Sequence, residues 1–178
     1  MALTMFDAVF PSVLRTLGSL DAILDKATAF CEARKIEPSV LLQYRLAPDM
    51  FALTRQFQIV TDQAKGMASR LAGVDVPAYA DTESTIPEVK ARIAKTRDYL
   101  KTFSASQIDG SEDRKISLKL GGNEMTFTGR DYVFGFVLPN FYFHAATAYD
   151  ILRHAGVELS KRDFLGAVDG FTPPQARS

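Results

Sequence analysis

Apolar residues recur at steps of three and four along three long stretches of this chain, residues 3–32, 48–71 and 86–103. Such spacing gives a helix one apolar face and predicts three amphipathic helices. In the second stretch the steps of three and four alternate, which is typical of a helix packed inside a bundle. Its apolar positions are Met50, Leu53, Phe57, Val60, Ala64, Met67 and Leu71.

Prolines, a glycine and a capping motif mark the expected ends of these helices. Pro11 lies inside the first stretch, so that helix should either start near it or kink at it. Pro48 followed by Asp49 suits the first turn of the second helix, and Gly73 suits its end. The motif Thr85-Ile-Pro-Glu88 matches a capping box at the start of the third helix. Charged residues of the third helix are expected on its solvent face: Arg92, Lys95, Asp98 and Lys101.

The pattern changes after the third helix to a period of two. Alternating apolar residues flank the pair Gly121-Gly122, which predicts a β-hairpin over about residues 116–128. Two strands alone are marginally stable, so the hairpin should pack its apolar side on the helices. The alternating positions are Ile116, Leu118, Leu120, Met125 and Phe127.

The last helix is rich in aromatic residues and runs from about Thr128 to Ala155. Pro139 cannot donate a hydrogen bond to the carbonyl of Gly135, so a kink or break is expected at residues 135–139. Residues 157–166 should fold back over the bundle, and 171–178 should form a flexible tail. The fold class is therefore mainly α: a four-helix bundle, one domain over residues 1–170, with a small β-hairpin between the third and last helices.

Composition narrows the function classes. Twenty-one basic and 21 acidic residues cancel, so the chain carries no electrostatic signal for nucleic acid or an anionic membrane. No stretch reaches the roughly 18 uncharged apolar residues of a membrane span. Cys31 is the single cysteine, so an internal disulfide cannot form, which fits a cytoplasmic protein.

One polar stripe on the last helix is the best candidate for chemistry. On a helical wheel, Asn140, His144 and Thr147 share the apolar, inward face. A buried polar group without a partner costs about 1–3 kcal/mol, so each must be bonded. His144 is either a core histidine bonded to another helix, or it lines a pocket that binds a metal or a ligand. The sequence has no HExxH, CxxC, phosphate-binding glycine loop or GxSxG motif.

Several segments resemble a bacterial and fungal family of unknown function within the DinB-like helical superfamily, which includes metal-binding members. The most specific is Pro139-Asn-Phe-Tyr-Phe-His144, and the likeness covers nearly the whole chain. It implies a four-helix bundle, usually dimeric, with a site between helices. The other segments are Leu46-Ala-Pro-Asp-Met50, Arg70-Leu-Ala-Gly73, Ile151-Leu-Arg-His154 and Asp163-Phe-Leu-Gly166.

The same resemblance assigns site residues. Metal-binding members use one histidine on the second helix and an HxxxH pair on the last helix. Here His144 falls at the second histidine of that pair, Asn140 at the first, and Gln56 is matched to the histidine of the second helix. Amide oxygens are poor ligands for zinc or nickel. Either the metal is lost and an uncharged pocket remains, or another group such as Asp49 completes a weaker site with His144.

Three hypotheses follow. We favour a small-molecule pocket without a metal cofactor, lined by Asn140, His144, Gln56, Tyr142 and Thr147. The alternative is a metal-dependent thiol-transferase type of enzyme with His144 as a zinc or nickel ligand. The third is a purely structural or partner-binding homodimer, an assembly that rests on the family resemblance alone.

Overall fold

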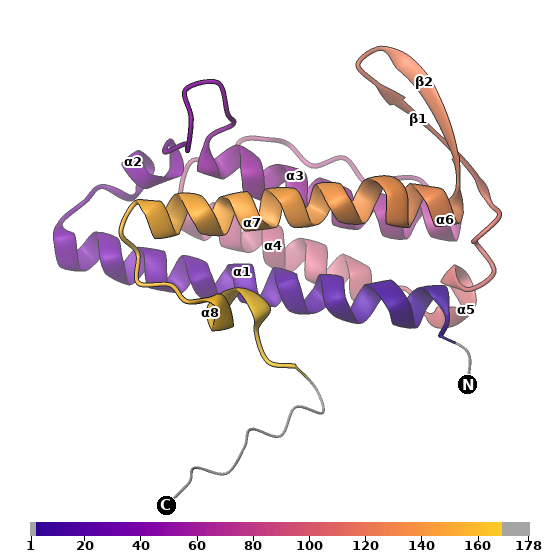
Figure 1. Ribbon diagram of the computed structural model, residues 1–178, viewed down its shortest axis with the longest axis horizontal. Helices are drawn as coiled ribbons and strands as arrows, with labels where there is room; N and C mark the ends of the chain where they lie inside the picture. Colours follow the sequence, from indigo (N-terminus) through magenta and orange to yellow (C-terminus); the bar gives the residue numbers. More distant parts are fainter. Residues whose placement is uncertain (1–2, 169–178) are drawn as a thin grey trace, which may run out of the picture.

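Four long helices lie alongside one another in the computed structural model, which describes residues 3–168 (Figure 1). They are α1 (Met5–Arg34), α3 (Leu53–Ala72), α4 (Ile86–Lys101) and α7 (Leu138–His154). Contacts between neighbours give the order α1, α4, α3, α7 around the bundle. Their apolar faces meet in one hydrophobic cluster. The predicted fold class, a mainly α four-helix bundle with a small hairpin, is confirmed.

Three short helices lie around the bundle (Figure 1). They are α2 (Pro38–Leu42), α5 (Ala105–Ile108) and α8 (Lys161–Leu165). As expected for residues 157–166, α8 folds back onto α1, where Lys26 pairs with Asp163 at 2.7 Å. The tail expected at residues 171–178 lies outside the described residues. Within residues 3–168, none of the helices combines the length and apolar character needed to cross a lipid bilayer.

The hairpin packs on the bundle through part of its apolar side, which includes Ile116, Leu118 and Phe127. Strands β1 (Lys115–Leu120) and β2 (Asn123–Thr128) are antiparallel, with Ile116 opposite Phe127 and Leu118 opposite Met125. Ile116 is buried, but Met125 near the turn is 44% exposed. Figure 1 shows the strands rising away from the helices. The expectation that the hairpin packs its apolar side on the helices therefore holds for Ile116, Leu118 and Phe127, whereas Met125 departs from it.

The second long helix begins at Leu53, not at Pro48 as predicted. The Leu53 N–H donates to the Tyr44 carbonyl at 2.9 Å, and this bond closes the loop before the helix. The first bond of the helical pattern runs from the Gln56 N–H to the Ala52 carbonyl at 3.2 Å. Pro48 therefore belongs to the loop, and Asp49 lies exposed outside the helix.

The first helix starts at Met5 and continues through Pro11, so it does not begin at the proline. Its N-cap is Thr4, whose hydroxyl accepts from the Asp7 N–H at 3.2 Å. Pro11 is exposed, and its missing donor leaves the Asp7 carbonyl on the solvent side. A proline is tolerated there because water replaces the lost bond. The capping box of Thr85 and Glu88 and the left-handed Gly73 end cap are present as predicted.

Arg92 departs from the prediction of a solvent face, because it is only 5% exposed. Its guanidinium pairs with Asp62 at 2.8 Å, with Asp81 at 3.0 Å and with Glu83 at 3.0 Å. Asp81 and Glu83 belong to the loop between α3 and α4, which folds over the arginine. A buried charge needs such partners. Arg92 thus ties that loop and α3 to α4.

The disturbance predicted at Pro139 takes the form of a π-helical segment rather than a break. One continuous helical path runs through α6 (Gly129–Asp131), η1 (Tyr132–Val137) and α7. At its end the Leu138 N–H donates to the Val133 carbonyl, five residues back. A π-helical turn holds one extra residue and often occurs at functional sites. The path continues past Pro139, which lies in the first turn of α7.

Candidate functional site

Gln56 of α3 and His144 of α7 meet across the contact between these helices. The Nδ1 atom of His144 lies 2.6 Å from the Oε1 atom of Gln56. Gln56 is 1% exposed and His144 is 9% exposed. Both were candidate site residues, and the structure brings them together. The sequence could indicate the facing helices but not this bond.

The hydrogen bonds around Gln56 fix the proton on His144. The Gln56 Nε2 group donates to the Phe51 carbonyl at 2.9 Å, which can only accept. The Gln56 oxygen therefore faces the ring, and an amide oxygen can only accept as well. We accordingly assign the proton of the neutral ring to Nδ1, which leaves a lone pair on Nε2. Burial, and then the nearby Arg55 cation, hold the pKa of His144 below its ordinary value of 6.5. The ring is thus neutral near pH 7.

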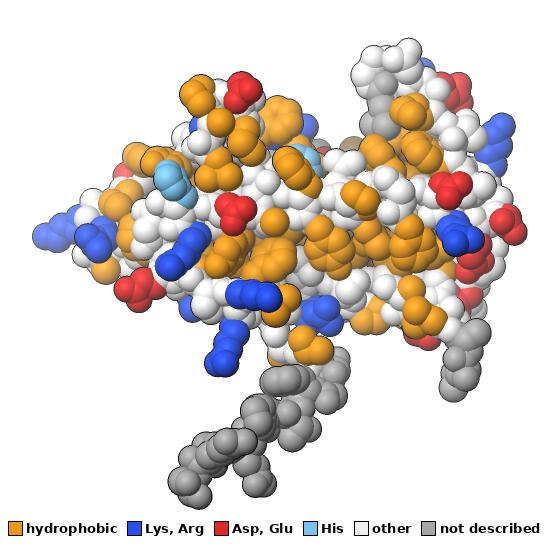
Figure 2. Space-filling view, viewed as in Figure 1, with side chains coloured by type: hydrophobic (Ala, Val, Ile, Leu, Met, Phe, Trp, Pro, Cys, Tyr) orange, Lys and Arg blue, Asp and Glu red, His pale blue; other side chains and the backbone are white. Residues whose placement is uncertain are grey.

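The Nε2 atom of His144 reaches the surface. It has no hydrogen-bond partner within residues 3–168, yet it is not among their buried polar side-chain atoms without a partner. Figure 2 shows histidine atoms as two pale-blue patches on one face, and the chain has two histidines. Phe143 meets the His144 ring edge-on, with centroids 5.1 Å apart. Phe143 is 58% exposed, and Phe51 of the adjoining loop is 56% exposed. A neutral acceptor therefore lies beside exposed aromatic surface.

The other predicted site residues bond within their own helix or lie outside it. The Asn140 amide donates to the Phe136 carbonyl at 3.2 Å. The Thr147 hydroxyl donates to the Phe143 carbonyl at 2.7 Å. Tyr142 is half-buried. The loop residue Asp49 is exposed, as described above.

These donors do not fit a zinc or nickel ion. One imidazole nitrogen, His144 Nε2, is free, and the Gln56 oxygen is directed at the Nδ1 proton of the same ring. Within residues 3–168, no three side chains of His, Cys, Asp or Glu gather in a way that could hold a metal ion. The bond from Gln56 resembles the outer contact that orients a metal-binding histidine, but the remaining ligands of such a site are amides.

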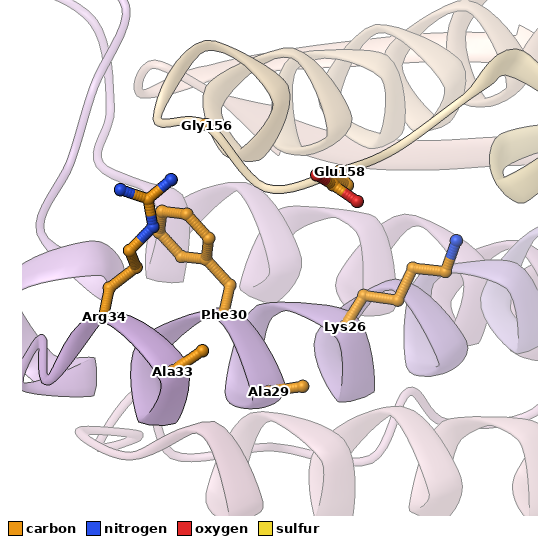
Figure 3. Close-up of a pocket in the computed structure, with 7 residues that line it drawn as sticks. All are labelled: Lys26, Ala29, Phe30, Ala33, Arg34, Gly156 and Glu158. Carbon is orange, nitrogen blue, oxygen red and sulfur yellow. The ribbon is translucent and has the colours of Figure 1, made fainter.

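A separate pocket of about 450 Å³ lies between the end of α1 and the loop after α7 (Figure 3). The Arg34 guanidinium lies 5.9 Å from the centroid of the Phe30 ring, and Lys26 is paired with Asp163. None of the predicted site residues lines it. Its lining residues are Lys26, Ala29, Phe30, Ala33, Arg34, Gly156 and Glu158.

The fold and the α3–α7 contact define a DinB-like helical-bundle protein. The chain is similar to a DinB family member protein from Shewanella denitrificans whose crystal structure is known: 39% of residues are identical, 95% of this chain and 96% of that chain are covered, and the TM-score is 0.84. Residues 5–165 match the model of a family described as a domain of unknown function, DUF1993. This chain belongs to the DUF1993 family. No curated protein matches it. The resemblance stated from the sequence is confirmed.

Proposed function

We propose that this protein binds a small, uncharged molecule at the Nε2 edge of His144, in a remnant of the superfamily metal site. The observation that carries the proposal is the 2.6 Å bond between Gln56 and His144. It holds the ring in one neutral tautomer and directs a lone pair outward. A fixed acceptor of this kind selects a ligand with an O–H or N–H donor.

The surroundings of His144 support a ligand that has an apolar or aromatic body and no positive charge. Phe51 and Phe143 offer exposed aromatic surface for an apolar or aromatic body. Arg55 carries a positive charge close enough to lower the pKa of His144, so the site disfavours a cationic ligand. Asn140 and Thr147 lie about one turn on either side of His144 on the same helix, whereas Tyr142, two residues away, points to another side of the helix.

Phenol and toluene test the proposal because they have similar size and only phenol can donate a hydrogen bond. We expect phenol to bind saturably, to shift the His144 Nε2 resonance in nitrogen NMR, and to bind about fivefold tighter than toluene, as for one net hydrogen bond. Phe143→Ala should weaken phenol binding. Phe134→Ala, which removes an exposed phenylalanine of η1, is the control and should not. Equal binding of phenol and toluene, or no effect of Phe143→Ala, would overturn the proposal.

Elemental analysis of untagged protein tests the metal-dependent alternative. Because the groups around His144 are mostly amides, we expect less than about a tenth of an equivalent of transition metal in the purified protein and no tight binding of added zinc or nickel. One equivalent of bound metal that disappears in His144→Ala would instead favour the thiol-transferase type of enzyme.

A homodimer is the third candidate, and one observation favours it. Figure 2 shows hydrophobic side chains in a band along the face where α7 and α1 lie side by side. Partly buried side chains on these helices include Leu14, Leu138 and Tyr142. Light scattering at micromolar concentration should then give twice the chain mass of 19.6 kDa. A monomeric mass would contradict the dimer.

A further inference from the structure

A second polar pocket lies at the other end of the α3–α7 contact, between α3, β1 and η1. Its volume is about 340 Å³. Arg70 and Tyr132 line it from the two helices, and Ser117 and Lys119 line it from the hairpin. Arg70 is fourteen residues from Gln56, which is about 21 Å along a helix. This pocket is therefore distinct from the surface beside His144.

Arg70 and Tyr132 present unused donors in this pocket. One guanidinium nitrogen of Arg70, Nη1, donates to the Tyr132 hydroxyl at 2.8 Å. A guanidinium has five N–H donors, and within residues 3–168 Arg70 makes no ion pair with a carboxylate. Tyr132 is 1% exposed, and its own O–H proton has no acceptor in the same part of the chain. Burial raises the pKa of Tyr132 against the opposing effect of Arg70, so the phenol keeps its proton.

Gly66 leaves room for the Arg70 guanidinium beside Tyr132. A Cβ atom at residue 66 would lie 2.4 Å from Arg70 Nη1. Glycine weakens the interior of a helix, and here its missing side chain leaves the space in which the guanidinium reaches Tyr132. An alanine at this position would displace the flexible end of Arg70 and leave the backbone in place.

The charges of the lining residues are unbalanced toward positive. Lys65, Arg70 and Lys119 are basic, and Asp62 is the carboxylate in the lining. The Asp62 carboxylate is already engaged by Lys65 at 2.9 Å and by Arg92 at 2.8 Å. The pocket therefore combines free donors with excess positive charge. An anion can accept hydrogen bonds from these donors and is attracted by the charge, so it is the ligand class that fits the pocket.

We propose that this pocket binds a small organic anion, a carboxylate or a phosphate ester. Its oxyanion accepts hydrogen bonds from the Arg70 guanidinium and the Tyr132 hydroxyl. Its apolar part lies against Leu118 and Phe136, which also line the pocket. This site goes beyond the proposed function at His144 and does not depend on it.

Calorimetric titration of the whole chain with benzoate, phenyl phosphate and neutral methyl benzoate tests the ligand class. Methyl benzoate has no hydrogen-bond donor, so it does not fit the acceptor at His144 either. We expect at least one anion to bind saturably and methyl benzoate to bind at least about tenfold more weakly, as for the loss of a charge-assisted hydrogen bond. The tighter of the two anions identifies carboxylate or phosphate as the group recognised. No saturable binding of either anion, or equal binding of methyl benzoate, would overturn the proposal.

Three variants assign the binding to this pocket. Arg70→Gln should weaken the tighter anion by about tenfold or more, and Tyr132→Phe and Gly66→Ala should weaken it severalfold. Arg153→Gln is the control, because it removes one exposed positive charge of α7 outside the lining. Gly66→Ala keeps the test decisive if Arg70→Gln does not fold. Unchanged affinity in both Tyr132→Phe and Gly66→Ala, or equal weakening in Arg153→Gln, would contradict the site. Phenol binding at His144 should be the same in all of them.

Discussion

The Gln56 carboxamide holds His144 from the facing helix, with its oxygen 2.6 Å from the ring nitrogen Nδ1. The other end of the same amide is bonded to the Phe51 carbonyl at 2.9 Å. One side chain thus joins α3, α7 and the loop before α3. Because both of its hydrogen bonds are buried or half-buried, substitution of Gln56 should lower the free energy of unfolding as well as change ligand binding.

Gln56→Leu should lower the free energy of unfolding by about 1–3 kcal/mol, because it leaves the Nδ1 proton of His144 buried without an acceptor. Urea denaturation measures the change. Gln43→Leu is the control, since Gln43 is exposed and should change the stability little. A Gln56→Leu protein as stable as the parent would mean that the 2.6 Å bond contributes nothing.

Stability should depend on pH through His144. Its folded pKa is lowered by burial and by Arg55, whereas the unfolded value is about 6.5. Between the two values the unfolded chain binds more protons, so this contribution is complete above about pH 6.5 and is lost as the pH falls through the folded pKa. Urea denaturation between about pH 7 and 5 should show the fall. His144→Asn should remove it, and His154→Asn should leave it; a fall that persists in His144→Asn would assign it to other groups.

Arg92→Met should destabilise the protein by roughly 3–5 kcal/mol, as expected when one partner of a buried ion pair is removed. The change leaves Asp62, Asp81 and Glu83 without their shared cation. Lys101→Met is the control, because its pair with Asp98 is exposed and such pairs are worth about 0–1 kcal/mol. Denaturation midpoints compare the two. Similar small effects would show that water replaces the partners of Arg92.

Two glycines of the last helical path should respond oppositely to alanine. A Cβ atom at Gly129 would lie 2.0 Å from the Ser111 carbonyl oxygen, whereas at Gly135 it would meet no atom of residues 3–168 within 4 Å. Gly129→Ala should cost at least about 2 kcal/mol through overpacking against backbone. Gly135→Ala should be neutral or add about 0.5–1 kcal/mol. Thermal unfolding distinguishes them, and equal midpoints would contradict the close approach of Ser111 to the helix.

The helices and their turn signals were predictable because they depend on local patterns. The capping box of Thr85 and the end cap at Gly73 each involve groups within a few residues. The start of α3 was not predictable, because it depends on the bond from Leu53 to Tyr44, nine residues back. Arg92 was misassigned for a similar reason: its burial comes from a loop whose course no helical wheel contains.

The candidate site was predictable only in part. The helical wheel placed His144 on the inward face, and the family resemblance pointed to Gln56, but neither shows that the two side chains bond to each other. Asn140 lies on the same face of the helical wheel as His144, yet its side-chain amide donates to the Phe136 carbonyl within the same helical path. The pair of Arg70 and Tyr132 left no motif, since it joins residues 62 positions apart.

The π-helical segment Tyr132–Val137 also sets the phase between the two ends of the last helix. Each residue turns an α-helix by about 100°, so one extra residue in a turn rotates everything beyond it by that angle. Tyr132, at the start of the segment, bonds to Arg70, and His144, beyond the end of the segment, bonds to Gln56. Arg70 and Gln56 both belong to α3. Deleting one residue from the segment would leave the length of the helix almost unchanged but send one of these side chains to another side of the bundle. The extra residue therefore determines which side chains of the last helical path face α3 on either side of the π-helical segment.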